Sequence, residues 1–213
     1  MKKGKLIVFE GTDGSGKATQ INLLAESFKK LKIPNEVISF PRYGQNPYAN
    51  LIRDYLDGKF DSKIDPYIFS LAFAIDRLLA KSKIEKWLRG GEIVLVDRYV
   101  ASNKAHMGAQ LLKEKRKEFI KWLDNLEYKT NKMPKEDLVI FLYVPPEISI
   151  GNIKKEERDL YEKDQKHQRD SSKIYLYLAK SPKWVTINCV SGGKMRGKEN
   201  IQKEILTIVK KNV

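Results

Sequence analysis

The sequence has 213 residues, of which 41% are hydrophobic and 32% charged, and its formal net charge is +14. This length is enough for one sizeable core, and the hydrophobic content fits a globular protein. No apolar run approaches the ~20 residues that a membrane-spanning helix needs, so we expect no membrane partner. The single cysteine, Cys189, permits no internal disulfide and fits a reducing compartment, so we expect a cytoplasmic protein.

The excess of positive charge raises the question of an anionic partner. A basic balance of this size often marks proteins that bind nucleic acid. Here much of the excess is lysine scattered along predicted helices rather than gathered in one block. We therefore favour anionic small-molecule substrates over nucleic acid.

The chain opens with a strand, a glycine-rich turn and a helix in direct succession. The apolar run at 6–9 predicts a buried strand, and Ile21, Leu24 and Phe28 recur at the spacing of one helix face. The segment between them consists of Gly11, Thr12, Asp13, Gly14, Ser15, Gly16, Lys17, Ala18 and Thr19. This order and spacing predict a phosphate-binding loop.

The chemistry of a polyphosphate explains the residue types in this loop. Glycines let the backbone curl so that its N–H groups point inward, and the helix N-terminus adds positive potential. We expect Lys17 to reach the β- and γ-phosphate oxygens. Ala18 departs from the pattern, because a Ser or Thr that binds Mg²⁺ usually follows the lysine. Thr19 lies one position too late for that role.

Further apolar runs alternate with helical patterns along the rest of the chain. They predict buried strands at 37–40, 93–96, 138–143 and 184–188. We expect helices at 48–57, 66–87, 114–135 and 199–211, the third of them amphipathic and without chemistry. The alternation predicts an α/β fold of the P-loop NTPase type, with a five-stranded parallel sheet between two helical layers in a single domain spanning 1–213. Ligands of such sheets bind at the carboxyl ends of the strands.

Charged residues follow two of these strands. Arg42 and Tyr43 come after the second strand, and Arg42 could bind a second phosphate as a planar fork. A solvated loop arginine is an equally good interpretation of Arg42. Asp97 and Arg98 end the third strand. An Asp at this place is the usual second Mg²⁺ contact beside a phosphate loop, and Arg98 adds a further phosphate ligand.

Three other features suit a nucleotide site, each with a plain structural alternative. Phe73 and Arg77 lie one helical turn apart, so they could stack on a base and bind its edge, or be a core Phe and a surface Arg. Asn103 carries the donor and the acceptor that a base edge needs, or is a polar residue at a helix N-terminus. The charged segment 151–162 suits a mobile lid, or a solvated helix.

Together these segments resemble the thymidylate kinase family, most closely its bacterial branch with actinobacterial members. The resemblance rests on 11–17, 40–45, 73–77 and 97–103. It implies a homodimer that transfers the γ-phosphoryl group of ATP to the 5′-phosphate of dTMP with Mg²⁺, giving dTDP for dTTP biosynthesis. The whole loop 11–19 would then bind ATP.

The resemblance also implies roles for single residues. It implies a catalytic set of Lys17, Arg98 and Asp13, and a catalytic arginine from the loop or the lid. Since the loop has none, we expect Arg158 of the lid in that role, rather than Lys154 or Lys155. The resemblance implies a dTMP site formed by Asp13, Phe40, Arg42, Tyr43, Phe73, Arg77, Arg98, Asn103, His106 and Tyr161. It implies Mg²⁺ ligands among Asp13, Asp97 and Glu162. His106 stands where relatives have Tyr or Phe near the deoxyribose 2′ carbon, which puts selectivity against ribonucleotides in question.

Two alternative functions remain open from the sequence. One is another nucleoside monophosphate kinase or a deoxynucleoside kinase, although Arg42 and Arg98 favour an acceptor that carries a phosphate. The other is a regulatory NTPase that uses hydrolysis as a switch. The chain lacks the Asn-Lys-x-Asp sequence with which GTPase switches read guanine, which weighs against this class.

Overall fold

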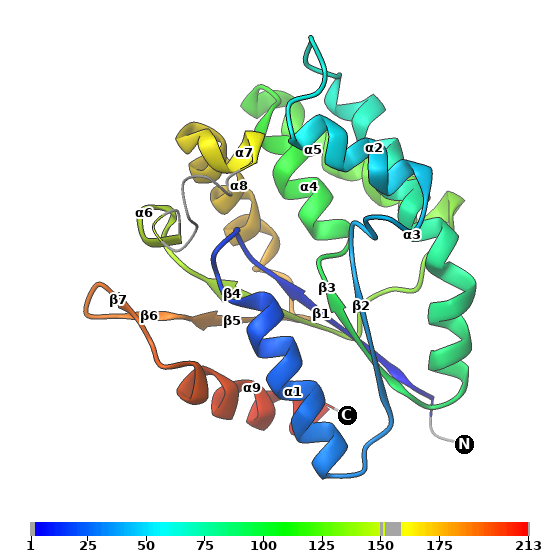
Figure 1. The fold of residues 1–213 in the computed structure, drawn as a ribbon, viewed down its shortest axis with the longest axis vertical. Coiled ribbons are helices and arrows are strands. Elements are labelled where there is room, and N and C mark those ends of the chain that lie inside the picture. The colour runs from blue at the N-terminus through cyan, green and yellow to red at the C-terminus, as the bar shows by residue number, and fades with distance from the viewer. Residues whose placement is uncertain (1–2, 150, 152–158, 213) are drawn as a thin grey trace.

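The computed structural model describes residues 3–149, 151 and 159–212. Its centre is a parallel sheet with the strand order β2-β3-β1-β4-β5 (Figure 1). The strands are β1 (Lys5–Glu10), β2 (Asn35–Ser39), β3 (Ile93–Asp97), β4 (Leu138–Tyr143) and β5 (Trp184–Asn188). All four pairings are parallel, so the predicted fold class and the five predicted strands are confirmed.

Helices cover both faces of the sheet (Figure 1). One layer contains α1 (Lys17–Lys30) and α9 (Lys198–Asn212). The other contains α2 (Pro47–Leu56), α3 (Pro66–Arg89), α4 (Val100–Ala109), α5 (Lys113–Asp124), the π-helix η1 (Asn125–Thr130) and α8 (Gln165–Leu178). Short elements complete the described chain: α6 (Pro146–Ser149), α7 (Leu160–Lys163), β6 (Val190–Ser191) and β7 (Lys194–Met195). No described helix is long and apolar enough to cross a membrane.

The central strand β1 explains why the strand sequences are continuously apolar. Leu6 and Val8 pack in the cluster beneath α3 and α4, and Ile7 and Phe9 pack in the cluster beneath α1 and α9. Both faces of β1 are therefore buried, as the sequence predicted. The edge strands differ, because β2 and β5 each contain only one buried residue. Two-sided burial was thus a wrong expectation for the edges, where the helical layers cover the sheet less completely.

The predicted helix at 114–135 is shorter than expected and changes form. After α5 the chain widens into the π-helix η1, in which the Asn131 N–H donates to the Leu126 carbonyl at 2.9 Å. Lys132 then takes the left-handed conformation with φ 52°, and Pro134 disfavours a helical Met133. The helix therefore ends at Thr130. No pattern in the sequence predicted helix α8 or the β6–β7 hairpin.

Candidate active site

The glycine-rich loop joins β1 to α1 at the carboxyl end of the sheet. Gly11, Gly14 and Gly16 all have positive φ angles, of 152°, 74° and 89°. A Cβ atom at Gly11 would lie 2.7 Å from the Leu142 carbonyl oxygen, so only glycine fits there. The tight turn that the glycine spacing predicted is confirmed, and Gly16 caps the N-terminus of α1.

Lys17 folds back over this loop. It is buried, and its Nζ donates to the Gly11 and Thr12 carbonyl oxygens, both at 3.0 Å. Burial and the nearby Arg98 guanidinium lower the pKa of Lys17 to about 8. The hydroxyls of Thr12 and Ser15 are buried and have no hydrogen-bond partner among the described residues. The loop thus holds a cation and unsatisfied polar groups, as a phosphate site requires.

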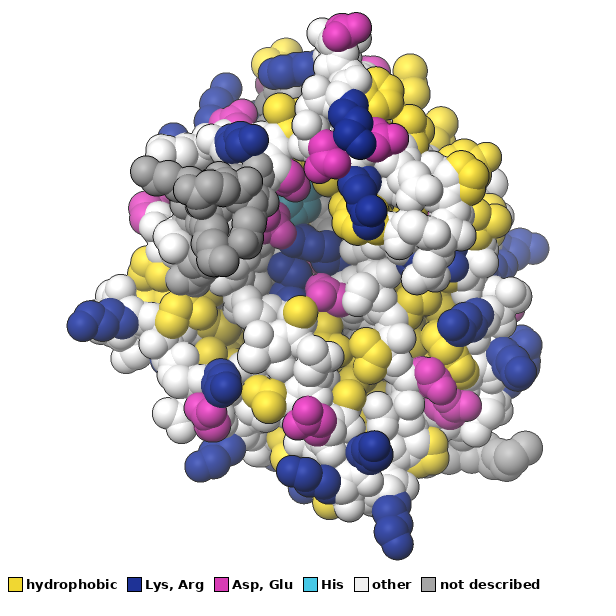
Figure 2. Space-filling view, in the orientation of Figure 1, with side chains coloured by type: hydrophobic (Ala, Val, Ile, Leu, Met, Phe, Trp, Pro, Cys, Tyr) yellow, Lys and Arg dark blue, Asp and Glu magenta, His cyan; other side chains and the backbone are white. Residues whose placement is uncertain are grey.

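Beside the loop lies a cavity bounded by the strand ends and by α2, α3, α4 and α7. Figure 2 shows a hollow near the middle of this face, with basic and histidine side chains inside it. Nine of the ten residues predicted for the dTMP site line the cavity: Asp13, Phe40, Tyr43, Phe73, Arg77, Arg98, Asn103, His106 and Tyr161. The lining also includes residues that the sequence reasoning missed: Pro41, Leu56, Tyr99, Ser102, Met107 and Asp159.

Arg42 is the predicted residue that does not line the cavity. Its Nε donates to Asp76 Oδ1 at 2.9 Å, and its Nη2 donates to the Asp76 carbonyl oxygen at 2.8 Å. Its backbone N–H also donates to Asp76 Oδ2 at 2.9 Å. Asp76 therefore holds the loop after β2 against α3, and in this arrangement Arg42 stabilises the wall of the cavity.

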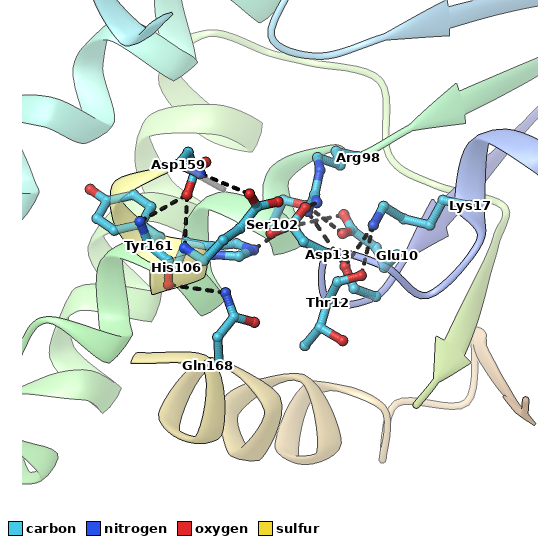
Figure 3. Close-up of polar contacts among 12 residues, drawn as sticks. Glu10, Thr12, Asp13, Lys17, Arg98, Ser102, His106, Asp159, Tyr161 and Gln168 are labelled. Carbon is cyan, nitrogen blue, oxygen red and sulfur yellow. Dashed lines mark hydrogen bonds and ion pairs between the residues drawn. The ribbon is translucent and has the colours of Figure 1, made fainter. Parts of the chain in front are cut away.

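At the phosphate end of the cavity, Arg98 forms an ion pair with Asp13 (Figure 3). Burial lowers the pKa of Arg98, but Asp13 together with Tyr175, Asp97 and Glu10 raises it overall. Burial raises the pKa of Asp13, while Arg98 and Lys17 together lower it to about 2. Both partners are therefore charged at neutral pH. Arg98 has a φ of 62°, a conformation uncommon outside glycine, which aims its side chain at the loop.

Two histidines and a tyrosine form a stack, of which His106 and Tyr161 line the cavity and His167 lies behind them. His106 Nδ1 lies 3.4 Å from His167 Nε2, and the Tyr161 and His167 ring centroids are 4.3 Å apart. Burial and then Arg98 hold the pKa of His106 well below its ordinary value, and burial lowers the pKa of His167 to about 4. Both imidazoles are therefore neutral at pH 7. No sequence motif marked His167.

The lining of the cavity also carries hydrogen-bonding groups from α3 and α4. The Asn103 amide donates to the Ser70 carbonyl oxygen at 3.3 Å, while its buried Oδ1 has no partner in the described part of the chain. Arg77 is buried, and its Nε donates to Glu127 Oε1 at 3.0 Å. The cavity lining therefore includes an unsatisfied acceptor and a guanidinium.

The predicted Mg²⁺ ligands differ in whether their carboxylate oxygens already have a partner. Asp97 Oδ1 is buried without a partner among the described residues, whereas Asp13 is paired with Arg98 and Glu162 Oε2 accepts from the Asp159 N–H at 2.9 Å. Across residues 3–149, 151 and 159–212, no three His, Cys, Asp or Glu side chains are grouped to hold a metal. The orphaned oxygen of Asp97, next to Phe9 in the sheet register, fits a cation beside the loop.

Only the two ends of the predicted lid lie among the described residues. Gly151 and 159–162 belong to the described residues, whereas the predicted catalytic Arg158 lies outside them. Asp159 caps α7 by accepting from the Tyr161 and Glu162 N–H groups, both at 2.8 Å. This cap places Tyr161 against the cavity. Burial and then Asp13 raise the pKa of Glu162 to about 7.

Comparisons with known proteins agree with this geometry. The family model described as "Thymidylate kinase" matches residues 9–205. The thymidylate kinase of Mycobacterium tuberculosis is 33% identical over 182 residues, covering 82% of this chain and 85% of that protein. The thymidylate kinase of Plasmodium falciparum is 30% identical over 210 residues, covering 99% and 91%. The solved structure of the Candida albicans thymidylate kinase superposes with a TM-score of 0.79 at 26% identity, covering 99% of this chain and 92% of that one. The chain therefore belongs to the thymidylate kinase family, and it is a phosphotransferase that converts dTMP to dTDP.

Proposed function

We propose that the cavity holds dTMP with its base against Arg77 and Asn103, and that the glycine-rich loop and Lys17 hold ATP as the phosphoryl donor. The observation that carries this assignment is the unsatisfied Asn103 Oδ1 in a cavity that Arg98 also lines. An acceptor nucleotide oriented in this way directs its 5′-phosphate toward the loop.

The polar groups at the base end match thymine and oppose cytosine. Thymine presents an acceptor at O4 and a donor at N3, and cytosine reverses this pattern. Arg77 can only donate, so it suits O4, and the free Asn103 oxygen suits the N3 hydrogen. Phe73 lines the same cavity and offers a ring face on which the base can stack. A cytosine would leave these buried groups unpaired.

Phosphoryl transfer asks this site for alignment and for neutralisation of charge. An oxygen of the acceptor phosphate attacks the γ-phosphorus, and no strong general base is needed. Arg98 orients the acceptor phosphate, and Lys17 moves from the loop carbonyls to the donor phosphates. Asp97, with Asp13 and Glu162 as further ligands, is the proposed place for Mg²⁺, which neutralises phosphate charge when bound.

A further cation is proposed from the lid. The loop has Gly14 after Asp13 and so offers no arginine of its own. We assign that role to Arg158, which lies outside the described residues, because its guanidinium suits a bidentate grip on phosphate. Arg158→Ala should lower kcat by roughly 10³-fold with a smaller effect on the KM for dTMP. The assignment is wrong if Lys155→Ala, and not Arg158→Ala, shows the large loss of kcat.

We also propose that the protein works as a single catalytic domain, as a homodimer and in the cytoplasm. Helix α3 leaves Ile68, Leu71 and Leu78 exposed, and Leu51 on α2 is exposed as well. The α3 residues lie three and seven positions apart, so they share a face that a second copy could cover. Light scattering of the wild type and of Leu78→Glu tests this: the variant should be monomeric.

The function is tested by two product assays on the same enzyme. Phosphate release with ATP alone should be slow, and ADP release should rise steeply when dTMP is added. Among dTMP, dUMP, dCMP, dAMP and dGMP, dTMP should give the highest kcat/KM. Fast hydrolysis without an acceptor would indicate a regulatory NTPase, and a preference for another nucleotide would indicate a different monophosphate kinase.

A further inference from the structure

The ion pair between Arg77 and Glu127 joins two distant parts of the chain at the base end of the cavity. Both side chains are buried, with exposures of 1% and 0%. Arg77 Nε and Nη2 both contact Glu127 Oε1, the former at 3.0 Å. Arg77 Nη1 makes no hydrogen bond to any described residue, and Arg77 lines the cavity. The carboxylate thus binds the Nε and Nη2 edge of the guanidinium and leaves Nη1 available.

The backbone that carries Glu127 is itself fixed to α3. Glu127 lies in the π-helix η1, and its carbonyl oxygen accepts from the Met133 N–H at 2.9 Å. Lys81, one helical turn after Arg77, donates from Nζ to the Asn131 carbonyl oxygen at 2.8 Å. Two side chains of α3 therefore hold this segment, Arg77 at Glu127 within η1 and Lys81 at Asn131 just after it. Widened helical turns of this kind occur often at functional sites.

The charge of Glu127 also matters at this place. Glu127 Oε2 is buried and has no partner among the described residues. A carboxylate with only one oxygen satisfied is costly to bury, and its pairing with Arg77 offsets that cost only in part. Burial lowers the pKa of Arg77, but the charge and hydrogen bond of Glu127, together with Tyr99 and Tyr128, raise it overall, so the guanidinium remains charged. The pair is neutral as a whole, which suits the uncharged base of a nucleotide.

We propose that Glu127 is a positioning residue for base recognition: it fixes the Arg77 guanidinium in the orientation that presents Nη1 to O4 of thymine. This inference rests on the proposed function, because it assumes that the base lies against Arg77. Glu127 does not touch the substrate and acts only through Arg77. Its contribution is to the choice of base, and it takes no part in phosphoryl transfer.

The test is the ratio of kcat/KM for dTMP over dCMP in Glu127→Gln. The glutamine keeps an acceptor oxygen but removes the charge that holds Arg77. We expect the ratio to fall by about tenfold or more, the scale of one charge-assisted hydrogen bond. The change should come from a higher KM for dTMP at nearly constant kcat. The ratio of dTMP over dUMP should not change, because uracil presents the same O4 and N3 groups.

A matched control separates positioning from general loss of stability. Arg116 and Asp170 form another little-exposed pair, at 2.8 Å, whose members do not line the cavity. Asp170→Asn should lower thermal stability without changing either ratio. In a double-mutant cycle, Arg77→Gln with Glu127→Gln should discriminate no worse than Arg77→Gln alone. If Glu127→Gln does not fold, Glu127→Asp replaces it, since it keeps the charge and shortens the reach.

The outcomes of this experiment distinguish the inference from the proposed function. If wild-type enzyme does not prefer dTMP to dCMP, the proposed base site is wrong. If the wild type prefers dTMP and folded Glu127 variants keep the full ratio, the base site stands and the positioning role of Glu127 is wrong. An equal change in the dTMP over dCMP ratio in Glu127→Gln and in Asp170→Asn would also overturn the positioning role.

Discussion

Glu10 at the end of β1 caps the N-terminus of α4 through Ser102. Glu10 Oε1 accepts from the Ser102 N–H at 3.1 Å, and Oε2 accepts from the Ser102 hydroxyl at 2.6 Å. The Tyr99 N–H and the Tyr175 hydroxyl donate to the same buried carboxylate, at 2.9 and 3.1 Å. Since α4 carries Asn103 and the glycine-rich loop begins beside Glu10, one carboxylate links the donor and acceptor sites.

This link predicts a combined effect of Glu10→Gln. Removing a charge that accepts four hydrogen bonds should cost about 1–3 kcal/mol of unfolding free energy. The kcat/KM for dTMP should fall as α4 shifts, which differential scanning calorimetry and steady-state kinetics can measure together. Tyr175→Phe removes one donor and leaves the cap intact. It should therefore lower the unfolding free energy and the kcat/KM for dTMP by less than Glu10→Gln does. Unchanged kinetics in a destabilised Glu10→Gln would show that the cap is structural only.

Lys17→Met tests the electrostatic role of the loop. Methionine keeps most of the stem and removes the charge that should neutralise the donor phosphates. We expect kcat to fall by ~10²-fold or more, as for the loss of one preorganised donor. The matched control is Lys29→Met, on the exposed part of the same helix. Near wild-type turnover in folded Lys17→Met would remove Lys17 from the catalytic set.

The lowered pKa of Lys17 predicts a pH dependence for ATP. In the free enzyme this pKa is about 8, below the ordinary value of 10.5, so raising the pH above 8 neutralises the amine. Protonated Lys17 binds the polyphosphate, so kcat/KM for ATP should fall by about tenfold per pH unit on the alkaline side. Lys17→Arg, which stays charged, should give a level profile. A wild-type profile that is level to pH 10 would contradict the account.

The sequence could predict those parts of the site that are local in the chain. Glycine spacing identifies the loop, and strand-end positions place Asp97 and Arg98 at one edge of a parallel sheet. Arg77 and Asn103 were expected at the base, and both line the cavity.

Contacts between remote segments could not be read in the same way. Glu127 lies 50 residues from Arg77, in a stretch whose sequence pattern indicates only an amphipathic helix. His167 lies 61 residues from His106. The pairing of Arg42 with Asp76 was likewise invisible, because a loop arginine suits a phosphate and a carboxylate equally.

His106 predicts a change in sugar selectivity. It lines the cavity, and its neutral imidazole can hydrogen-bond to a ribose 2′-hydroxyl. His106→Phe removes that partner, so the ratio of kcat/KM for dUMP over UMP should rise by about tenfold. His167→Phe alters the same stack from a position that does not line the cavity, and should leave the ratio unchanged. An equal rise of the dUMP over UMP ratio in the two variants would show that the effect comes from packing of the stack.

The most direct test of the central claim is to identify the acceptor by chromatography of the products formed from ATP with dTMP or with thymidine. Arg98 at the phosphate end of the cavity requires an acceptor that already carries a phosphate. The account predicts dTDP from dTMP and no measurable dTMP from thymidine. It also predicts that Arg98→Gln loses roughly 10²-fold in kcat/KM for dTMP, as expected for a charge-assisted phosphate contact that aligns the reaction. Comparable phosphorylation of thymidine, or full activity of Arg98→Gln on dTMP, would contradict it.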